Sequence, residues 1–120
     1  MHQPKEIAMQ AAKALADKKG INIQLLDVAD LTTLADYFLI CTGTSGIHVN
    51  TLCDAVEKAV ADDLEEPLLH REGHRSGTWV LLDFGSLIVH VFTEETRKFY
   101  DLEHLWSDST PVPLDFEEKT

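Results

Sequence analysis

Two runs rich in β-branched, aromatic and aliphatic residues, 78–84 and 87–93, flank the dipeptide Gly85-Ser86. A tight, glycine-containing turn between two such runs predicts a β-hairpin. A two-residue loop also fixes the register, and a shift of one residue would exchange the two faces of the hairpin. The predicted pairs are Phe84 with Leu87, Leu82 with Val89 and Val80 with Val91 on an apolar face, and Trp79 with Phe92, Leu81 with His90 and Asp83 with Ile88 on a mixed face. We expect the apolar face to belong to the core and the mixed face to be where function could reside.

The segment after the hairpin has the pattern of a helix. Thr93 suits the N-cap position, and Glu94 and Glu95 place negative charge at the positive end of the helix dipole. Four apolar residues recur at helical spacing and predict a buried stripe, namely Phe99, Leu102, Leu105 and Trp106. Tyr100 and Asp101 fall off that stripe, so we expect them to point elsewhere.

The chain before the hairpin alternates between helical and strand patterns. The expected elements are a helix that begins at Pro4 and stops before Gly20, strands over 21–28 and 36–42, a helix capped by Ser45, and a short edge strand over 68–71. Together with the hairpin and the last helix, they predict an α/β sandwich with a mixed five-stranded sheet.

Residues 107–120 differ in composition from the rest of the chain. They mix Ser, Pro and acidic residues and show no apolar period. We therefore expect one folded domain over residues 1–106 and an acidic, flexible tail over residues 107–120.

The charge of the chain restricts its partners. Lys and Arg number 10 against 21 Asp and Glu, which gives a net charge of -11 at pH 7. This balance argues against a sequence-independent hold on nucleic-acid phosphates, because such binding needs clustered basic residues, and it favours a basic protein surface. Two cysteines make no disulfide framework, and the sequence has no secretory signal or long apolar span, so we expect a cytoplasmic protein that enters no membrane.

The turn Gly43-Thr44-Ser45 is the first candidate for chemistry, since backbone donors at the start of a helix can hold a phosphate. The pattern favours a simpler interpretation, a strand-to-helix turn capped by Ser45. Nucleotidyl transfer also needs clustered carboxylates to hold magnesium, and the strands that follow offer only Asp83. We therefore expect no catalytic, cofactor-binding or metal-binding residues. A small nucleotidyltransferase-like enzyme with an incomplete metal site is the alternative function.

Two other groups of titratable residues could bind a metal ion or take part in acid-base chemistry. His70, Glu72 and His74 match no standard spacing of metal ligands, so we expect solvated turn residues there. Asp83 and His90 are near enough across the hairpin to form an acid-base pair. Because the sequence places no nucleophile beside them, a structural hydrogen bond is favoured over catalysis.

Trp79 and Tyr100 admit two interpretations. Core packing is the default for any single aromatic residue. Each of them, however, stands near an acid, Asp83 and Asp101 respectively, and that composition is typical of an interface hot spot that faces a basic partner. The residues alone leave the two interpretations equal.

Four stretches resemble one known family. They are Trp-Val-Leu-Leu-Asp-Phe-Gly (79–85), Ile-Val-His-Val-Phe (88–92), Phe-Tyr-Asp-Leu-Glu-His-Leu-Trp (99–106) and, upstream, Ala-Asp-Tyr-Phe-Leu-Ile-Cys-Thr-Gly-Thr-Ser (35–45) followed by His48-Val49. In this order they resemble the ribosomal silencing factor RsfS, also called Iojap. The resemblance implies a nucleotidyltransferase-like variant of the α/β fold in a protein that is not an enzyme.

The resemblance also implies a partner and a site. The partner would be the large ribosomal subunit, bound through ribosomal protein uL-fourteen, and binding would block association of the ribosomal subunits and repress translation. The partner-binding residues would be Trp79, Asp83, Tyr100 and Asp101. Homodimerisation through the same mixed face of the hairpin is a further possibility.

Overall fold

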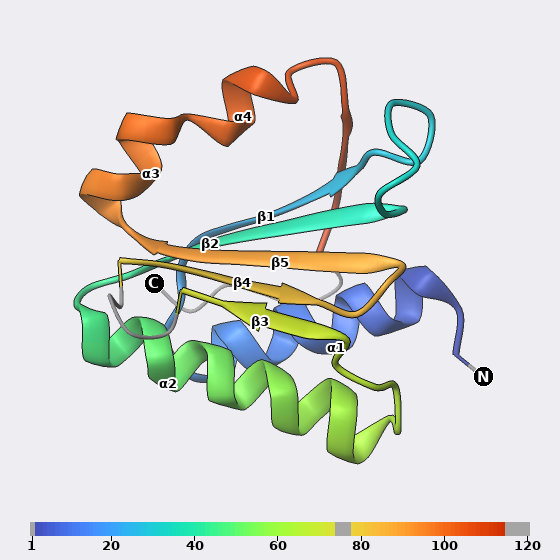
Figure 1. Cartoon of the computed structure of the whole chain (residues 1–120), viewed down its shortest axis with the longest axis horizontal. Coiled ribbons are helices and arrows are strands. Elements are labelled where there is room, and N and C mark those ends of the chain that lie inside the picture. The colour runs from blue at the N-terminus through green and yellow to red at the C-terminus, as the bar shows by residue number, and fades with distance from the viewer. Residues whose placement is uncertain (1, 74–77, 115–120) are drawn as a thin grey trace.

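The computed structural model of the chain describes residues 2–73 and 78–114 (Figure 1). In chain order its elements are α1 (Pro4–Asp17), β1 (Ile21–Asp27), β2 (Tyr37–Gly43), α2 (Gly46–Glu57), the π-helical turn η1 (Lys58–Asp63), β3 (His70–Glu72), β4 (Trp79–Asp83), β5 (Leu87–Thr93), α3 (Glu94–Tyr100), α4 (Leu102–Leu105) and β6 (Thr110–Val112). Among the described residues, no helix has the length and apolar character that crossing a membrane requires.

The described strands form one mixed sheet in the order β3-β4-β5-β2-β1-β6. The central pair, β2 and β5, is parallel, and the other neighbours are antiparallel. The mixed sheet and the α/β class are therefore confirmed, and so is the edge position of the strand near residue 70. The buried, non-alternating sequence of β2 agrees with its place between β1 and β5.

The predicted number of five strands is wrong, because β6 adds a sixth. Val112 pairs with Leu25 and Thr110 with Asp27, so β6 covers part of the outer edge of β1. A three-residue strand is too short to show a period of two, and Pro111 is tolerated because it lies in an edge strand. The boundary at residue 106 stays a prediction, although β6 lies beyond it. Residues 115–120 of the expected tail lie outside the described residues.

The register of the hairpin is confirmed throughout. Trp79 pairs with Phe92, Leu81 with His90 and Asp83 with Ile88, and on the opposite face Val80 pairs with Val91 and Leu82 with Val89. The Phe84 amide donates to the Leu87 carbonyl oxygen over 2.9 Å, which closes the turn. Gly85 has a φ of 88°, a conformation that side-chain-bearing residues rarely adopt.

Helices α1 and α2 cover one face of the sheet, and the apolar face of the hairpin packs beneath them (Figure 1). Pro4 begins α1 as predicted. Ser45 caps α2, since its side chain accepts a hydrogen bond from the His48 amide over 3.1 Å. The core on this side is made mainly of aliphatic and small side chains from α1, α2 and the central strands, together with the Phe84 ring.

The opposite face of the sheet carries α3 and α4 and a smaller core (Figure 1). Leu102 is buried in it, and Trp106 packs against it, as the predicted stripe requires. The rest of the stripe is wrong, because Phe99 is 80% exposed and Leu105 is 70% exposed. Phe99 leaves the stripe because the helix breaks at Asp101, whose φ of 47° is left-handed and separates α3 from α4. Residues on the two sides of this break no longer share one helical period.

Candidate functional site

The mixed face of the hairpin meets the end of α3 in a cluster of aromatic rings. The ring centroids of Trp79 and Tyr100 lie 4.5 Å apart, and the Phe99 ring stands edge-on to Tyr100 at 5.1 Å. Trp79 is half-buried, whereas Tyr100 is 51% exposed. We call these three residues, Trp79, Phe99 and Tyr100, the aromatic corner. The rings of Phe99 and Tyr100 are available to a partner, because the rest of the described chain does not cover them.

His90 holds the ring of Trp79, the least exposed member of the aromatic corner, in place. The Trp79 indole N–H donates to His90 Nδ1 over 3.3 Å, and Trp79 also contacts the Phe92 ring. Burial lowers the pKa of His90 to about 4, so the imidazole is neutral at physiological pH and keeps a lone pair for the indole. The predicted pair of His90 with Asp83 is therefore wrong: His90 Nδ1 accepts from Trp79, and the Asp83 carboxylate accepts from the Gly85 amide.

Asp83 lies away from the aromatic corner. It ends β4, four residues after Trp79, which corresponds to about 13 Å along a strand. Its carboxylate accepts a hydrogen bond from the Gly85 amide over 2.8 Å, so it supports the hairpin turn. The structure thus brings Trp79, Tyr100 and Asp101 together at one end of the sheet and leaves Asp83 at the other end.

Acidic residues border the aromatic corner. Asp101 follows Tyr100 directly and is exposed, and the exposed Glu94 and Glu95 begin the same helix. Residues 94–106 contain four acidic and two basic side chains. Of the two basic residues, Lys98 pairs with Glu94 at 3.5 Å and Arg97 is buried. The free charge at this surface is therefore negative, which suits a basic partner.

Arg97 is a buried residue that the sequence did not predict, and it is only 7% exposed. Its Nη1 donates to the Asn22 carbonyl oxygen and to Thr42 Oγ1, each over 2.8 Å, and its Nε and Nη2 donate to the Glu103 carboxylate over 3.1 and 3.2 Å. These partners are six to 75 residues away in the chain. No local spacing rule connects them, so the sequence alone carries no signal for this cluster.

The turn Gly43-Thr44-Ser45 is organised for packing and capping. His48 Nδ1 accepts from the Thr44 amide over 2.9 Å, and His48 Nε2 donates to the Lys18 carbonyl oxygen over 2.8 Å. The imidazole therefore occupies the Thr44 amide, which a phosphate would need. A Cβ atom on Gly43 would stand 2.8 Å from Val49 Cγ2, so glycine is required for the approach of α2. These contacts support the interpretation of the turn as a capped helix start.

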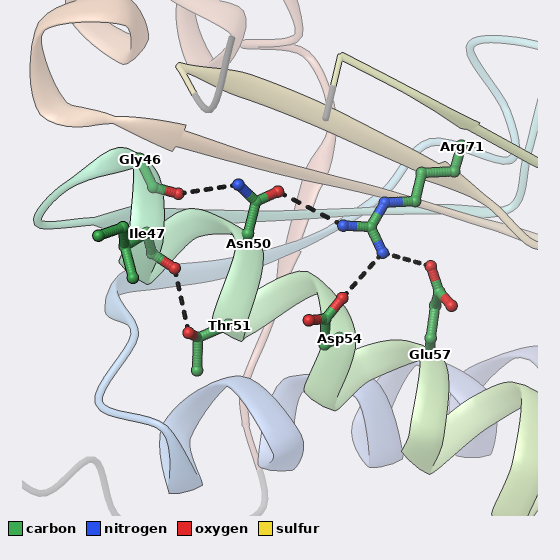
Figure 2. Close-up of polar contacts among 7 residues, drawn as sticks. All are labelled: Gly46, Ile47, Asn50, Thr51, Asp54, Glu57 and Arg71. Carbon is green, nitrogen blue, oxygen red and sulfur yellow. Dashed lines mark hydrogen bonds and ion pairs between the residues drawn. The ribbon is translucent and has the colours of Figure 1, made fainter. Parts of the chain in front are cut away.

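A second polar cluster fastens the edge strand β3 to α2 (Figure 2). Arg71 Nη1 donates to Asp54 over 3.1 Å and to Glu57, while Nη2 reaches Asn50 Oδ1 at 3.5 Å. Hydrogen bonds to these acids raise the pKa of Arg71, although burial works in the opposite direction and is the largest single influence. The side chain of Arg71 is 20% exposed, so the pair is partly shielded from water. This cluster lies on the face of the sheet that α1 and α2 cover, across from the aromatic corner (Figure 1).

Of the three residues predicted to lie in a solvated turn, His70 and Glu72 are exposed to solvent but belong to the edge strand β3, where they pair with Asp83 and Leu81 of β4. His70 Nε2 and a Glu72 carboxylate oxygen lie 2.6 Å apart in an exposed pair, and His74 lies outside the described residues. Over residues 2–73 and 78–114, no group of three or more His, Cys, Asp or Glu side chains is arranged to hold a metal ion.

These features define a small α/β protein with a mixed sheet and with a surface suited to contact another protein. Its family follows from comparison with known proteins. The family model described as "Ribosomal silencing factor during starvation", RsfS, matches residues 1–120. The chain belongs to this family, which is one of ribosome-associated regulators and not of enzymes.

Individual relatives agree with the family model. The chain is 39% identical over 112 residues to the ribosomal silencing factor RsfS of Bacillus subtilis, covering 93% of this chain and 94% of that protein. It is 32% identical over 112 residues to the chloroplastic protein Iojap of Zea mays, covering 92% of this chain and 47% of that protein. A crystal structure of a protein from Chromobacterium violaceum matches with a TM-score of 0.86 at 33% identity, covering 99% of this chain and 98% of the other.

Proposed function

We propose that this ribosomal silencing factor binds ribosomal protein uL-fourteen on the large subunit and thereby blocks association with the small subunit. Translation falls because joined ribosomes no longer form. The observation that carries the proposal is the aromatic corner, where the exposed Tyr100 lies against Trp79 beside the exposed Asp101. We place this activity in the cytoplasm, where the subunits join.

The aromatic corner has the physical properties of an interface hot spot. Such hot spots are enriched in Trp and Tyr, which supply a large contact area with few rotatable bonds. Here the Trp79 indole is held by its hydrogen bond to His90 and by the Phe92 ring. Little side-chain freedom remains for Trp79 to lose on binding, so most of its contact energy is available for affinity.

The charge of the protein complements a basic partner. The net charge of -11 and the acids around the aromatic corner attract positively charged protein surfaces over distances up to a Debye length of about 8 Å at physiological ionic strength. The same charge repels the phosphates of ribosomal RNA, so we expect little direct contact with nucleic acid. Binding to the ribosome through a ribosomal protein is therefore favoured over binding through ribosomal RNA.

The size of the protein supports a steric mechanism. The Cα trace extends over 33 × 32 × 29 Å. Surfaces that form an interface approach to within hydrogen-bond or one-water distances, so a body of this size seated between two subunits holds them apart. Silencing then needs no catalytic step.

Co-sedimentation with isolated large subunits tests the proposal. The wild type should pellet with large subunits and should slow their joining to small subunits, as followed by light scattering. Tyr100→Ala should bind roughly thirtyfold more weakly, which corresponds to about 2 kcal/mol at a hot spot. Leu34→Ala is the matched control, because Leu34 is also an exposed large apolar residue but lies in the β1–β2 loop at the opposite end of the sheet.

Three results would count against the proposal. Equal binding by wild type and Tyr100→Ala would remove the aromatic corner from the interface. Equal binding to assembled ribosomes and to isolated subunits would contradict the steric mechanism. A stable homodimer that persists in the presence of large subunits would show that the aromatic corner serves self-association instead.

A further inference from the structure

The inference concerns Arg97 and rests on the proposed function. We propose that Arg97 is a positioning residue for the ribosome-binding surface, which sets the orientation of Tyr100 and Asp101 by fixing α3 and α4 to the sheet. It does not need to touch the partner. Its role is to present other residues that do.

The attachment of α3 to the sheet is unusual in kind. A surface helix is normally held by a stripe of buried apolar side chains. In α3, however, the buried residue is Arg97, and the aromatic residues Phe99 and Tyr100 at its end are both exposed. A helix of seven residues is not stable in isolation. Because α3 lacks a buried apolar stripe, its placement depends on the polar contacts of Arg97.

Those contacts connect four elements of the structure. Nη1 of Arg97 binds the backbone oxygen of Asn22 in β1 and the hydroxyl of Thr42 in β2, each at 2.8 Å. The other edge of the guanidinium forms a two-pronged ion pair with Glu103 in α4. Charge-assisted, two-pronged pairs are strong and directional, and the burial of Arg97 shields this one partly from water, since the Glu103 side chain is 35% exposed.

The two residues of the ion pair also flank the residues of the site in the sequence. Arg97 and Glu103 bracket the segment Phe99-Tyr100-Asp101, and the Asp101 amide donates to the Arg97 carbonyl oxygen over 2.8 Å. Asp101 itself has the left-handed φ of 47° that separates α3 from α4. Arg97 therefore holds both ends of the turn that presents Tyr100 towards Trp79. Without it, the turn would lose its only buried side-chain anchor within α3.

Lysine cannot replace arginine in this position. Its ammonium is a compact charge on a flexible stem, so it cannot satisfy Thr42, the Asn22 carbonyl and both Glu103 oxygens in one geometry. Arg97→Lys keeps the charge and most of the volume but loses the planar set of guanidinium donors. It therefore tests geometry while limiting the loss of folding stability.

The experiment compares affinity for isolated large subunits with the structure of the aromatic corner in the free protein. Arg97→Lys and Glu103→Gln should each weaken binding at least tenfold. In both variants, hydrogen exchange over residues 94–106 should accelerate and the near-ultraviolet circular dichroism of the Trp79–Tyr100 contact should decrease. Exchange in α1 and α2 should stay close to that of the wild type.

Arg71→Lys is the matched control. Arg71 is also a partly buried arginine that pairs with acids, but it joins β3 to α2 on the other face of the sheet (Figure 2). We expect this variant to lose stability without losing affinity for large subunits. Arg97→Lys should lose affinity even when the assay temperature is lowered until both variants are equally well folded.

The outcomes separate the inference from the proposed function. Failure of the wild type to bind large subunits overturns the proposed function and the inference with it. Binding by the wild type that Tyr100→Ala weakens and Arg97→Lys leaves intact overturns only the positioning role of Arg97. Equal loss of affinity in the Arg71 and Arg97 variants assigns Arg97 to general stability and overturns the inference as well.

Discussion

The neutral His90 beneath Trp79 makes the stability of this protein depend on pH. Burial lowers the pKa of His90 from 6.5 to about 4 in the folded state. In the unfolded chain the imidazole is exposed and has an ordinary pKa of about 6.5. Between these two values the unfolded state binds more protons than the folded state, so the free energy of unfolding rises with pH. The contribution of His90 is complete above pH 6.5 and is lost as the pH falls towards 4.

The size of this effect follows from the two pKa values. The lost free energy of unfolding should be about 2 kcal/mol at pH 5 and about 3 kcal/mol at pH 4, since each pKa unit corresponds to about 1.4 kcal/mol. Urea unfolding of the wild type and of His90→Gln at pH 7, 6 and 5 measures it. Carboxylates contribute to the acid sensitivity of both proteins, so the difference between them isolates the histidine. Identical pH dependence in the two proteins would refute the reasoning.

Three further predictions concern charge, the sixth strand and thiol chemistry. Asp101→Asn should keep the fold, because asparagine tolerates the left-handed φ of 47°, and should slow association with large subunits at low salt; an unchanged on-rate would free Asp101 of a role. Val112→Asp should lower the free energy of unfolding in urea by about 1–3 kcal/mol, because Val112 of β6 packs against the main core; unaltered stability would show that β6 is dispensable. Burial raises the pKa of the Cys53 thiol to about 12, so a thiol reagent at pH 8 should label Cys53 only upon unfolding; rapid labelling of the native protein would contradict this.

The sequence predicts the centre of the fold well because several local rules agree there. The short turn and the alternation of apolar residues determine the register of β4 and β5. Five of the six predicted pairs are strand pairs, and the sixth, Phe84 with Leu87, is joined by the backbone hydrogen bond that closes the turn. The signals that start α1 and α2 are also local, since Pro4 is the first residue of α1 and Ser45 caps the first turn of α2. Such features need no knowledge of distant parts of the chain.

The features that the sequence analysis missed depend on contacts between distant residues. The three residues of β6 form a strand because the edge of β1 is available to them, and their own pattern does not show it. The break at Asp101 leaves Phe99 exposed where a continuous helix would have buried it. Arg97 finds partners on β1, β2 and α4 that no helical spacing could indicate.

The candidate site was predicted in part. The acids near Trp79 and Tyr100 left core packing and an interface equally favoured, and the family resemblance implied the interface; the structure brings the two rings to 4.5 Å. Asp83 was included on the same hairpin face, but its side chain serves the turn at Gly85. The supporting residues His90 and Arg97 emerge only from the folded structure, because their importance lies in what they hold in place.

Photo-crosslinking from position 100 tests the central claim most directly. A photoreactive phenylalanine analogue in place of Tyr100 keeps an aromatic ring at the exposed end of α3, and the same analogue in place of Leu34 serves as the control. Irradiation of the complex with large subunits, followed by mass spectrometry, identifies the attached ribosomal protein. The expected result is an adduct with uL-fourteen from position 100 and none from position 34. An adduct from position 100 with another ribosomal protein, with ribosomal RNA or with a second copy of this chain would contradict the proposed docking.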